Sequence, residues 1–227
     1  MVLAAVVFPL LIFLFVANPA LTQTRQEADQ IVEKARFTLD GFIADNNMGP
    51  FHDAVKRAQG MLIVPQLLKG AFIVGASGGT GVFVAWDQDR KRWAGPAFYT
   101  MGGASFGFQI GGEASEVILL AMTQRGVTAL LSNSVKLGAD VGIAVGPVGA
   151  GASAASANIS VDILSFSKSK GLYGGISLEG AVVATRDGLN EAYYGKPARP
   201  MEILIRSDVT NPASDPLLGA VKKYTGR

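Results

Sequence analysis

Residues 60–112, GMLIVPQLLKGAFIVGASGGTGVFVAWDQDRKRWAGPAFYTMGGASFGFQIGG, carry the pattern that decides the fold. Four or five short apolar runs, rich in Val, Ile, Phe, Tyr and Trp, are separated by Gly or Pro, and each is about as long as a β-strand. The only polar run among them is Asp87–Arg92, which we expect at the exposed tip of a hairpin. The stretch therefore predicts an antiparallel meander with strands at Met61–Val64, Ala71–Gly75, Gly81–Trp86, Pro96–Met101 and Ser105–Ile110.

The glycine-rich segment Gly75–Gly81 lies between two of these runs and has two interpretations. A phosphate-binding loop would need a Gly-Lys-Ser/Thr ending or a following helix, and the segment has neither. A tight hairpin turn is the favoured interpretation. Glycines inside strands also permit bends, bulges and close backbone approach. We therefore expect a strongly curved sheet, as in a partly closed barrel or a sandwich.

Composition restricts the classes of function. The chain has 227 residues, 49% of them hydrophobic and 17% charged, which suits one large domain with a sizeable core. A net charge of +2 is too balanced for a general nucleic-acid binder. The absence of cysteine excludes disulfides, thiol catalysis and acylation at a lipoprotein cysteine, and His52 is the sole histidine. We expect no enzyme activity, no metal and no cofactor; a hydrolase would need two convergent carboxylates, or a serine beside His52.

Residues 1–21 are apolar and carry no charge. The run 2–16 suits the hydrophobic region of a signal peptide, and residues 17–20 supply small and helix-breaking residues where such a peptide is cut. A retained membrane anchor is the alternative, because the apolar length is near the lower limit of about 17 residues for a spanning helix; a buried helix is the third. The favoured interpretation is an exported protein, periplasmic or membrane-associated in a bacterial envelope. Residues 22–227 are then one domain.

Helical periodicity surrounds the meander and makes the expected fold α+β. Thr22–Ala44 has apolar residues at three- and four-residue spacing, with Thr24 and Glu27 resembling a capping box. Its functional interpretation is a membrane-touching amphipathic helix, and the favoured alternative is a helix packed on the sheet. The clearest period-two pattern, Asn158–Ser167, predicts a strand that ends in a turn at Lys168–Gly171. Further helices are expected at Phe51–Gln59, Thr123–Ser132, Asp187–Tyr194, Met201–Arg206 and Pro216–Tyr224, the last two packing as closing C-terminal pieces.

Two basic turns are candidate contacts with anionic lipid. Arg90, Lys91 and Arg92 precede Trp93 at the hairpin tip, and Lys168 and Lys170 lie at the second turn. Each basic residue near an anionic bilayer contributes about 1 kcal/mol, so together they would give weak, reversible adhesion. The alternative is that both turns are simply solvated and that Trp93 faces the core.

Glycine- and aromatic-containing segments spread over the chain resemble the SYLF domain family. The resemblance covers roughly Gln30 to Ile205, in order and in spacing. The matching segments are Lys69–Gly75, Gly78–Val82, Trp93–Tyr99, Gly102–Gly112, Leu137–Asp140, Gly146–Gly149, Ser165–Gly175, Leu178–Gly180 and Asn190–Gly195.

This resemblance implies a lipid-binding domain. Eukaryotic members of the family bind phosphoinositides, and the yeast actin-regulating members also bind and bundle actin filaments, which would apply here only to a eukaryotic cytosolic protein. The family's lipid contacts lie in the basic N-terminal part of the domain, which here carries Lys34, Arg36, Lys56, Arg57 and Lys69. The expected function is thus a non-enzymatic envelope protein that binds anionic phospholipid or phosphoinositide-like headgroups. The alternative is a structural or protein–protein interaction module of the envelope, which predicts an exposed apolar patch.

Overall fold

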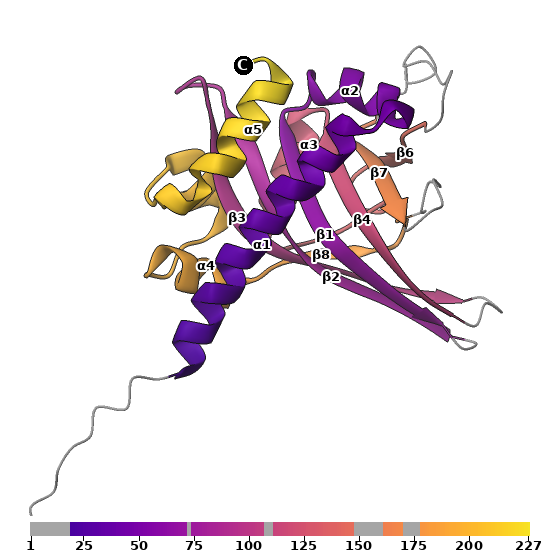
Figure 1. The fold of residues 1–227 in the computed structure, drawn as a ribbon, viewed down its shortest axis with the longest axis horizontal. Helices are drawn as coiled ribbons and strands as arrows, with labels where there is room; N and C mark the ends of the chain where they lie inside the picture. Colours follow the sequence, from indigo (N-terminus) through magenta and orange to yellow (C-terminus); the bar gives the residue numbers. More distant parts are fainter. Residues whose placement is uncertain (1–18, 72–73, 107–110, 148–160, 170–177) are drawn as a thin grey trace, which may run out of the picture.

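The computed structural model describes residues 19–71, 74–106, 111–147, 161–169 and 178–227 (Figure 1). At its centre these residues form one open, strongly curled sheet with the strand order β5-β8-β3-β2-β1-β4-β7-β6. Neighbouring strands are antiparallel except β6 and β7, which run parallel. The strands are β1 Gly60–Ala71, β2 Val74–Asp87, β3 Arg92–Phe106, β4 Gly111–Ala121, β5 Ser134–Lys136, β6 Ile143–Val145, β7 Ile163–Ser169 and β8 Val182–Thr185.

Helices cover both faces of this sheet. On one face α1 lies across the strands with α5 and α4 beside it (Figure 1), and its buried side chains, such as Leu39 and Phe42, join a core with Ile63 and Phe98. On the other face α3 and η3 close a second core around Phe83. The helical elements are α1 Pro19–Ala44, η1 Asn46–Met48, α2 Gly49–Val55, α3 Gln124–Leu130, α4 Asp187–Tyr194, η3 Glu202–Arg206, η4 Pro212–Ser214 and α5 Asp215–Thr225.

The expected α+β class and the curved sheet are confirmed, with three corrections. The expected strands Ala71–Gly75 and Ser105–Ile110 are not separate strands: the first spans the end of β1 and the start of β2, and Ser105 and Phe106 end β3, while residues 107–110 lie outside the described residues. The sheet is a mixed half barrel, because β6 pairs with β7 in parallel. The glycine-rich segment Gly75–Gly81 is not a hairpin turn. It lies inside β2, where it is paired with both β1 and β3. By contrast, the expected tip at Asp87–Arg92 is the β2–β3 connection.

A β-bulge in β1 explains why β2 needs glycine at this place. Val64 and Pro65 of β1 face the single residue Gly81 of β2, because the register shifts between Ile63 and Gln66. A Cβ on Gly81 would collide with the carbonyl oxygen of Ile63. The glycines therefore allow two backbones to approach closely, which is the strand-interior role expected from the sequence.

Several element boundaries also differ from the expectation. α1 begins at Pro19, so Thr24 lies inside the helix and forms no N-terminal cap. Asp187 is the first residue of α4, and Arg186 stands at the N-cap with no side-chain cap. Lys168 belongs to β7 and not to a turn, while Lys170 and residues 1–18 lie outside the described residues. Among the helices that are described, none is long and apolar enough to cross a membrane.

Candidate functional site

The β2–β3 hairpin tip is fixed to the C-terminal part of the chain by Arg90. Its guanidinium lies 2.8 Å from the carboxylate of Asp87 and donates to the carbonyl oxygens of Ile205 and Arg206 at 3.0 and 3.1 Å. Burial alone would raise the pKa of Asp87, but hydrogen bonds from Arg90 and from the Asp89 backbone outweigh it, and the pKa is lowered. Arg90 is thus a positioning residue of the tip, with its charge balanced by Asp87.

The next two basic residues of the tip meet the end of α5 at a shallow hollow. Lys91 and Arg92 line it together with Lys222 and Arg227, around a volume of about 280 Å³. Lys91, Arg92 and Lys222 are exposed. The one acidic side chain among the described residues of the lining is Asp215. We call this site, made of Lys91, Arg92, Lys222 and Arg227, the basic hollow.

Two tryptophans form the aromatic wall of the basic hollow. The rings of Trp86 and Trp93 meet edge to face at 5.8 Å, and the Arg227 guanidinium lies 5.1 Å from the Trp86 ring centroid. Trp93 is only 5% exposed, and its indole nitrogen donates to Thr225 Oγ1 at 3.0 Å. The alternative in which Trp93 faces the core is therefore the one that the structure shows, and Trp86 is the more accessible ring.

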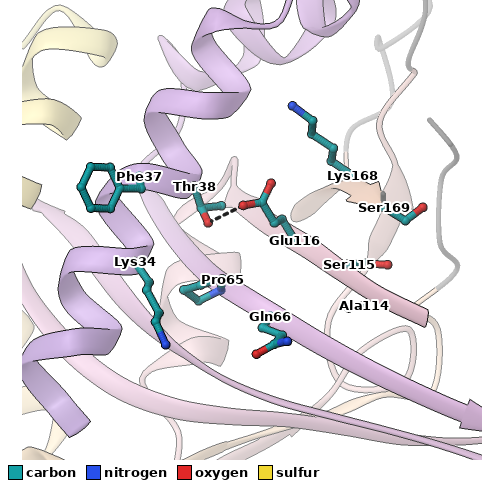
Figure 2. A pocket seen from close by; sticks show the side chains of 10 residues that line it. All are labelled: Lys34, Phe37, Thr38, Pro65, Gln66, Ala114, Ser115, Glu116, Lys168 and Ser169. Atoms are coloured by element: carbon teal, nitrogen blue, oxygen red, sulfur yellow. Dashed lines mark hydrogen bonds between the residues drawn. The ribbon is translucent and has the colours of Figure 1, made fainter. Parts of the chain in front are cut away.

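A second hollow lies between α1 and the sheet (Figure 2). Its volume is about 510 Å³, which falls in the range of roughly 300–1,000 Å³ common for small-molecule sites. The Phe37 ring stands at its rim, and the bulge residues Pro65 and Gln66 form its floor. We call it the α1 groove; it is lined by Lys34, Phe37, Thr38, Pro65, Gln66, Ala114, Ser115, Glu116, Lys168 and Ser169.

Polar contacts hold the walls of the α1 groove in place. Thr38 Oγ1 donates to Glu116 Oε1 at 3.0 Å and so ties α1 to β4 (Figure 2). Lys168 Nζ lies 3.2 Å from a carboxylate oxygen of Asp45, whose side chain is only 9% exposed. Lys168 therefore neutralises a largely buried acid at the end of α1.

The remaining candidate basic residues do not converge. Arg36 is paired with Asp40 at 2.8 Å, and Lys56 lies 4.0 Å from Asp53. Lys69 lies nine residues along β1 from Gly60, which pairs with Ala85 near the β2–β3 tip. Nine residues of extended strand place Lys69 roughly 30 Å from that end of the sheet. Arg57 is exposed just after α2, close to the basic hollow, because Arg227 Nη2 donates to the carbonyl oxygen of Ala58. The basic residues predicted from the two turns and those implied by the family resemblance therefore do not form one site. Some line the basic hollow, some line the α1 groove, and the rest lie elsewhere.

Sequence reasoning missed Lys222 and Arg227 as site residues. The only local signal was a basic last turn on the C-terminal helix, which also occurs in ordinary helices because it complements the helix dipole. Within the described residues, no group of three or more His, Cys, Asp and Glu side chains is placed to hold a metal ion. His52 Nε2 lies 3.2 Å from the carbonyl oxygen of Phe42, at the end of α1.

The fold and the two hollows define an α+β domain with one basic hollow and one hollow of mixed apolar and polar lining on its surface. Residues 102–224, just over half of the chain, match the family described as "Ysc84: Las17-binding protein actin regulator". The chain therefore belongs to the Ysc84 (SYLF) family, and the resemblance seen in the sequence is confirmed.

Curated eukaryotic relatives agree with this assignment. Protein YSC84 of Saccharomyces cerevisiae is 33% identical over 182 residues, covering 78% of this chain and 38% of the yeast protein. LAS seventeen-binding protein 3 of the same yeast is 34% identical over 180 residues, again 78% and 38%. The human SH3 domain-containing YSC84-like protein 1 is 33% identical over 200 residues, covering 86% of this chain and 57% of the human protein. The chain thus spans about two fifths of the yeast relatives and somewhat over half of the human one.

Proposed function

We propose that this protein is a non-enzymatic module that binds anionic lipid at a membrane surface through the basic hollow, as an exported envelope protein. The observation that carries the proposal is the meeting of Lys91 and Arg92 with Lys222 and Arg227, from elements about 130 residues apart. Asp215 is the one acidic side chain among the described residues of the lining. Such a local excess of positive charge on a chain of net charge +2 favours anionic ligands.

The expected strength of this binding is modest. Four basic residues at about 1 kcal/mol each give on the order of 4 kcal/mol, which is weak, reversible adhesion. Because these side chains are mostly exposed, salt screens the attraction over about 8 Å at physiological ionic strength. Arg57 is exposed and precedes Ala58, whose carbonyl oxygen accepts a hydrogen bond from Arg227, and it extends the basic surface. Trp86 adds an amphipathic ring suited to the headgroup region.

The alternative, a protein–protein interaction module, predicts an exposed apolar patch. The large apolar side chains that are exposed in the described residues come from separate elements: Phe37, Leu68, Val145, Val182 and Met201. This scatter favours the lipid proposal over a single apolar docking face. The relatives named for Las17 binding and for SH3 domains are longer proteins, and this chain covers 38% and 57% of their lengths.

Vesicle co-sedimentation of the full chain tests the proposal. Neutral phosphatidylcholine vesicles and vesicles that also contain phosphatidylserine are compared at low and high salt. The test variant combines Lys91→Gln, Arg92→Gln and Lys222→Gln, and leaves Arg90 in place because it anchors the hairpin. The matched control combines Lys136→Gln, Lys196→Gln and Arg199→Gln, which removes the same charge from exposed residues of other elements.

The wild type should co-sediment only with the anionic vesicles, and this co-sedimentation should disappear at high salt. The test variant should bind about a hundredfold more weakly, because three contacts of about 1 kcal/mol are removed. The control variant should stay within about threefold of the wild type. Equal binding to neutral vesicles, equal losses in the two variants, or no binding at all would each refute the proposal.

A further inference from the structure

The α1 groove owes its floor to the bulge in β1. Pro65 and Gln66 face the single residue Glu116 of β4, because the β1–β4 register shifts between Val64 and Leu67. The extra residue interrupts the regular strand pairing directly under α1, and bulges are enriched next to binding sites. The groove is therefore part of the fold of the sheet and does not depend on the packing of surface side chains alone.

The lining of the groove is amphiphilic. Phe37 is 54% exposed and lines one edge of the groove, with the Arg36 guanidinium 4.2 Å from its ring centroid. Its ring projects from the side of α1 that faces away from Glu116 (Figure 2). Ala114 and the aliphatic stem of Lys34 continue this apolar surface. An exposed phenylalanine at the rim of a hollow offers contact area to an apolar chain.

The charges of the groove are arranged asymmetrically. Lys34 is exposed, and none of the ion pairs found among the described residues involves it. Lys168 is already held by Asp45, and Glu116 places a carboxylate, fixed by Thr38, on the β4 side. An anionic group is therefore attracted to Lys34 and repelled from Glu116, which sets the direction of a bound ligand.

We infer that the α1 groove binds a single-chain amphiphile that carries one carboxylate or phosphate. Its anionic group pairs with Lys34, and its alkyl chain lies over Pro65 and Ala114 against Phe37. This site differs from the basic hollow in its residues and in its ligand, which is a monomeric molecule and not a membrane surface. The inference does not rest on the proposed function.

Titration of the ¹⁵N-labelled full chain with decanoate, below the concentration at which it forms micelles, tests the inference by NMR. Decanol, acetate and decyl phosphate serve as the uncharged, chainless and phosphate counterparts. Decanoate and decyl phosphate should bind saturably and shift the amide signals of residues 34–38, 66 and 114–116. Acetate should not bind, because it has no chain to bury.

Three variants locate the contacts. Lys34→Gln should weaken decanoate binding about tenfold and leave decanol binding unchanged, because one charge-assisted contact is lost. Phe37→Ala should weaken both ligands about threefold to tenfold, and its exposed position makes loss of folding a minor concern. Lys136→Gln, an exposed lysine outside the groove, should change neither. The triple variant of the basic hollow should keep decanoate binding even where it loses vesicles, which separates the two proposals.

Three outcomes would overturn the inference. They are the absence of saturable decanoate binding, signal shifts that cluster away from α1 and β4, and decanoate binding that is as strong in Lys34→Gln as in the wild type.

Discussion

The carbonyl oxygen of Gln66 occupies the space that a Cβ on Gly79 would need. The Gly79→Ala variant should therefore lower the free energy of unfolding by about 1–3 kcal/mol, because one of two tightly paired backbones must move. Gly78→Ala is the matched control in the same strand, since a Cβ there meets nothing within 4 Å. Its unfolding free energy should change by no more than about 0.5 kcal/mol. Urea denaturation measures both, and equal stability of the two variants would contradict the bulge argument.

Asp87 should make stability depend on pH in the acidic range. Hydrogen bonds and Arg90 lower its pKa in the folded state, so its contribution is present above the ordinary pKa of about 3.9 and is lost as the pH falls through the lower folded value. Asp87→Asn should cost about 1–2 kcal/mol at pH 7, and the gap to the wild type should narrow below about pH 4. Urea unfolding at several pH values measures this gap. If the difference in free energy of unfolding between the wild type and Asp87→Asn stays constant or widens toward low pH, the charge of the Asp87 carboxylate does not stabilise the fold.

Trp86 and Trp93 should report differently on a bound bilayer. Anionic vesicles containing brominated lipid should quench the tryptophan fluorescence of the wild type. Trp86→Phe should lose most of this quenching, whereas Trp93→Phe should keep it, because Trp93 is 5% exposed and bonded to Thr225. If Trp93→Phe is the variant that loses quenching, the membrane-facing surface is not the one proposed.

Lys168 should matter for stability and not for vesicle binding. Lys168→Gln leaves Asp45 without its 3.2 Å ion pair, and the pair is partly buried. We expect a cost of about 1–2 kcal/mol, between the values for exposed and buried pairs. Lys34→Gln, which breaks none of the ion pairs among the described residues, is the stability control. If Lys168→Gln leaves the free energy of unfolding unchanged but abolishes vesicle binding, this prediction is wrong and Lys168 contacts the lipid.

Sequence patterns predict an element correctly where its buried and exposed residues alternate with the period of a helix, or where a charged run separates two apolar runs. The three- and four-residue spacing in Thr22–Ala44 corresponds to α1, and the charged run Asp87–Arg92 corresponds to the β2–β3 tip. The expected turn at Gly75–Gly81 is wrong, because glycines occur equally in a tight turn and in a strand that must pass close to another backbone. Only the bulge at Pro65, on a different strand, distinguishes the two.

The sequence by itself determined the family, the α+β class and the curved sheet, because these depend on local periodicity and on glycines spread in a fixed order. It could not determine which basic residues act together. Arg90 and Lys168 are neutralised by Asp87 and Asp45, Trp93 is buried against α5, and Lys222 joins Lys91 and Arg92 across about 130 residues of chain. Tertiary structure decided this, because the charge available to a ligand depends on which acids the folded chain brings within ion-pair distance.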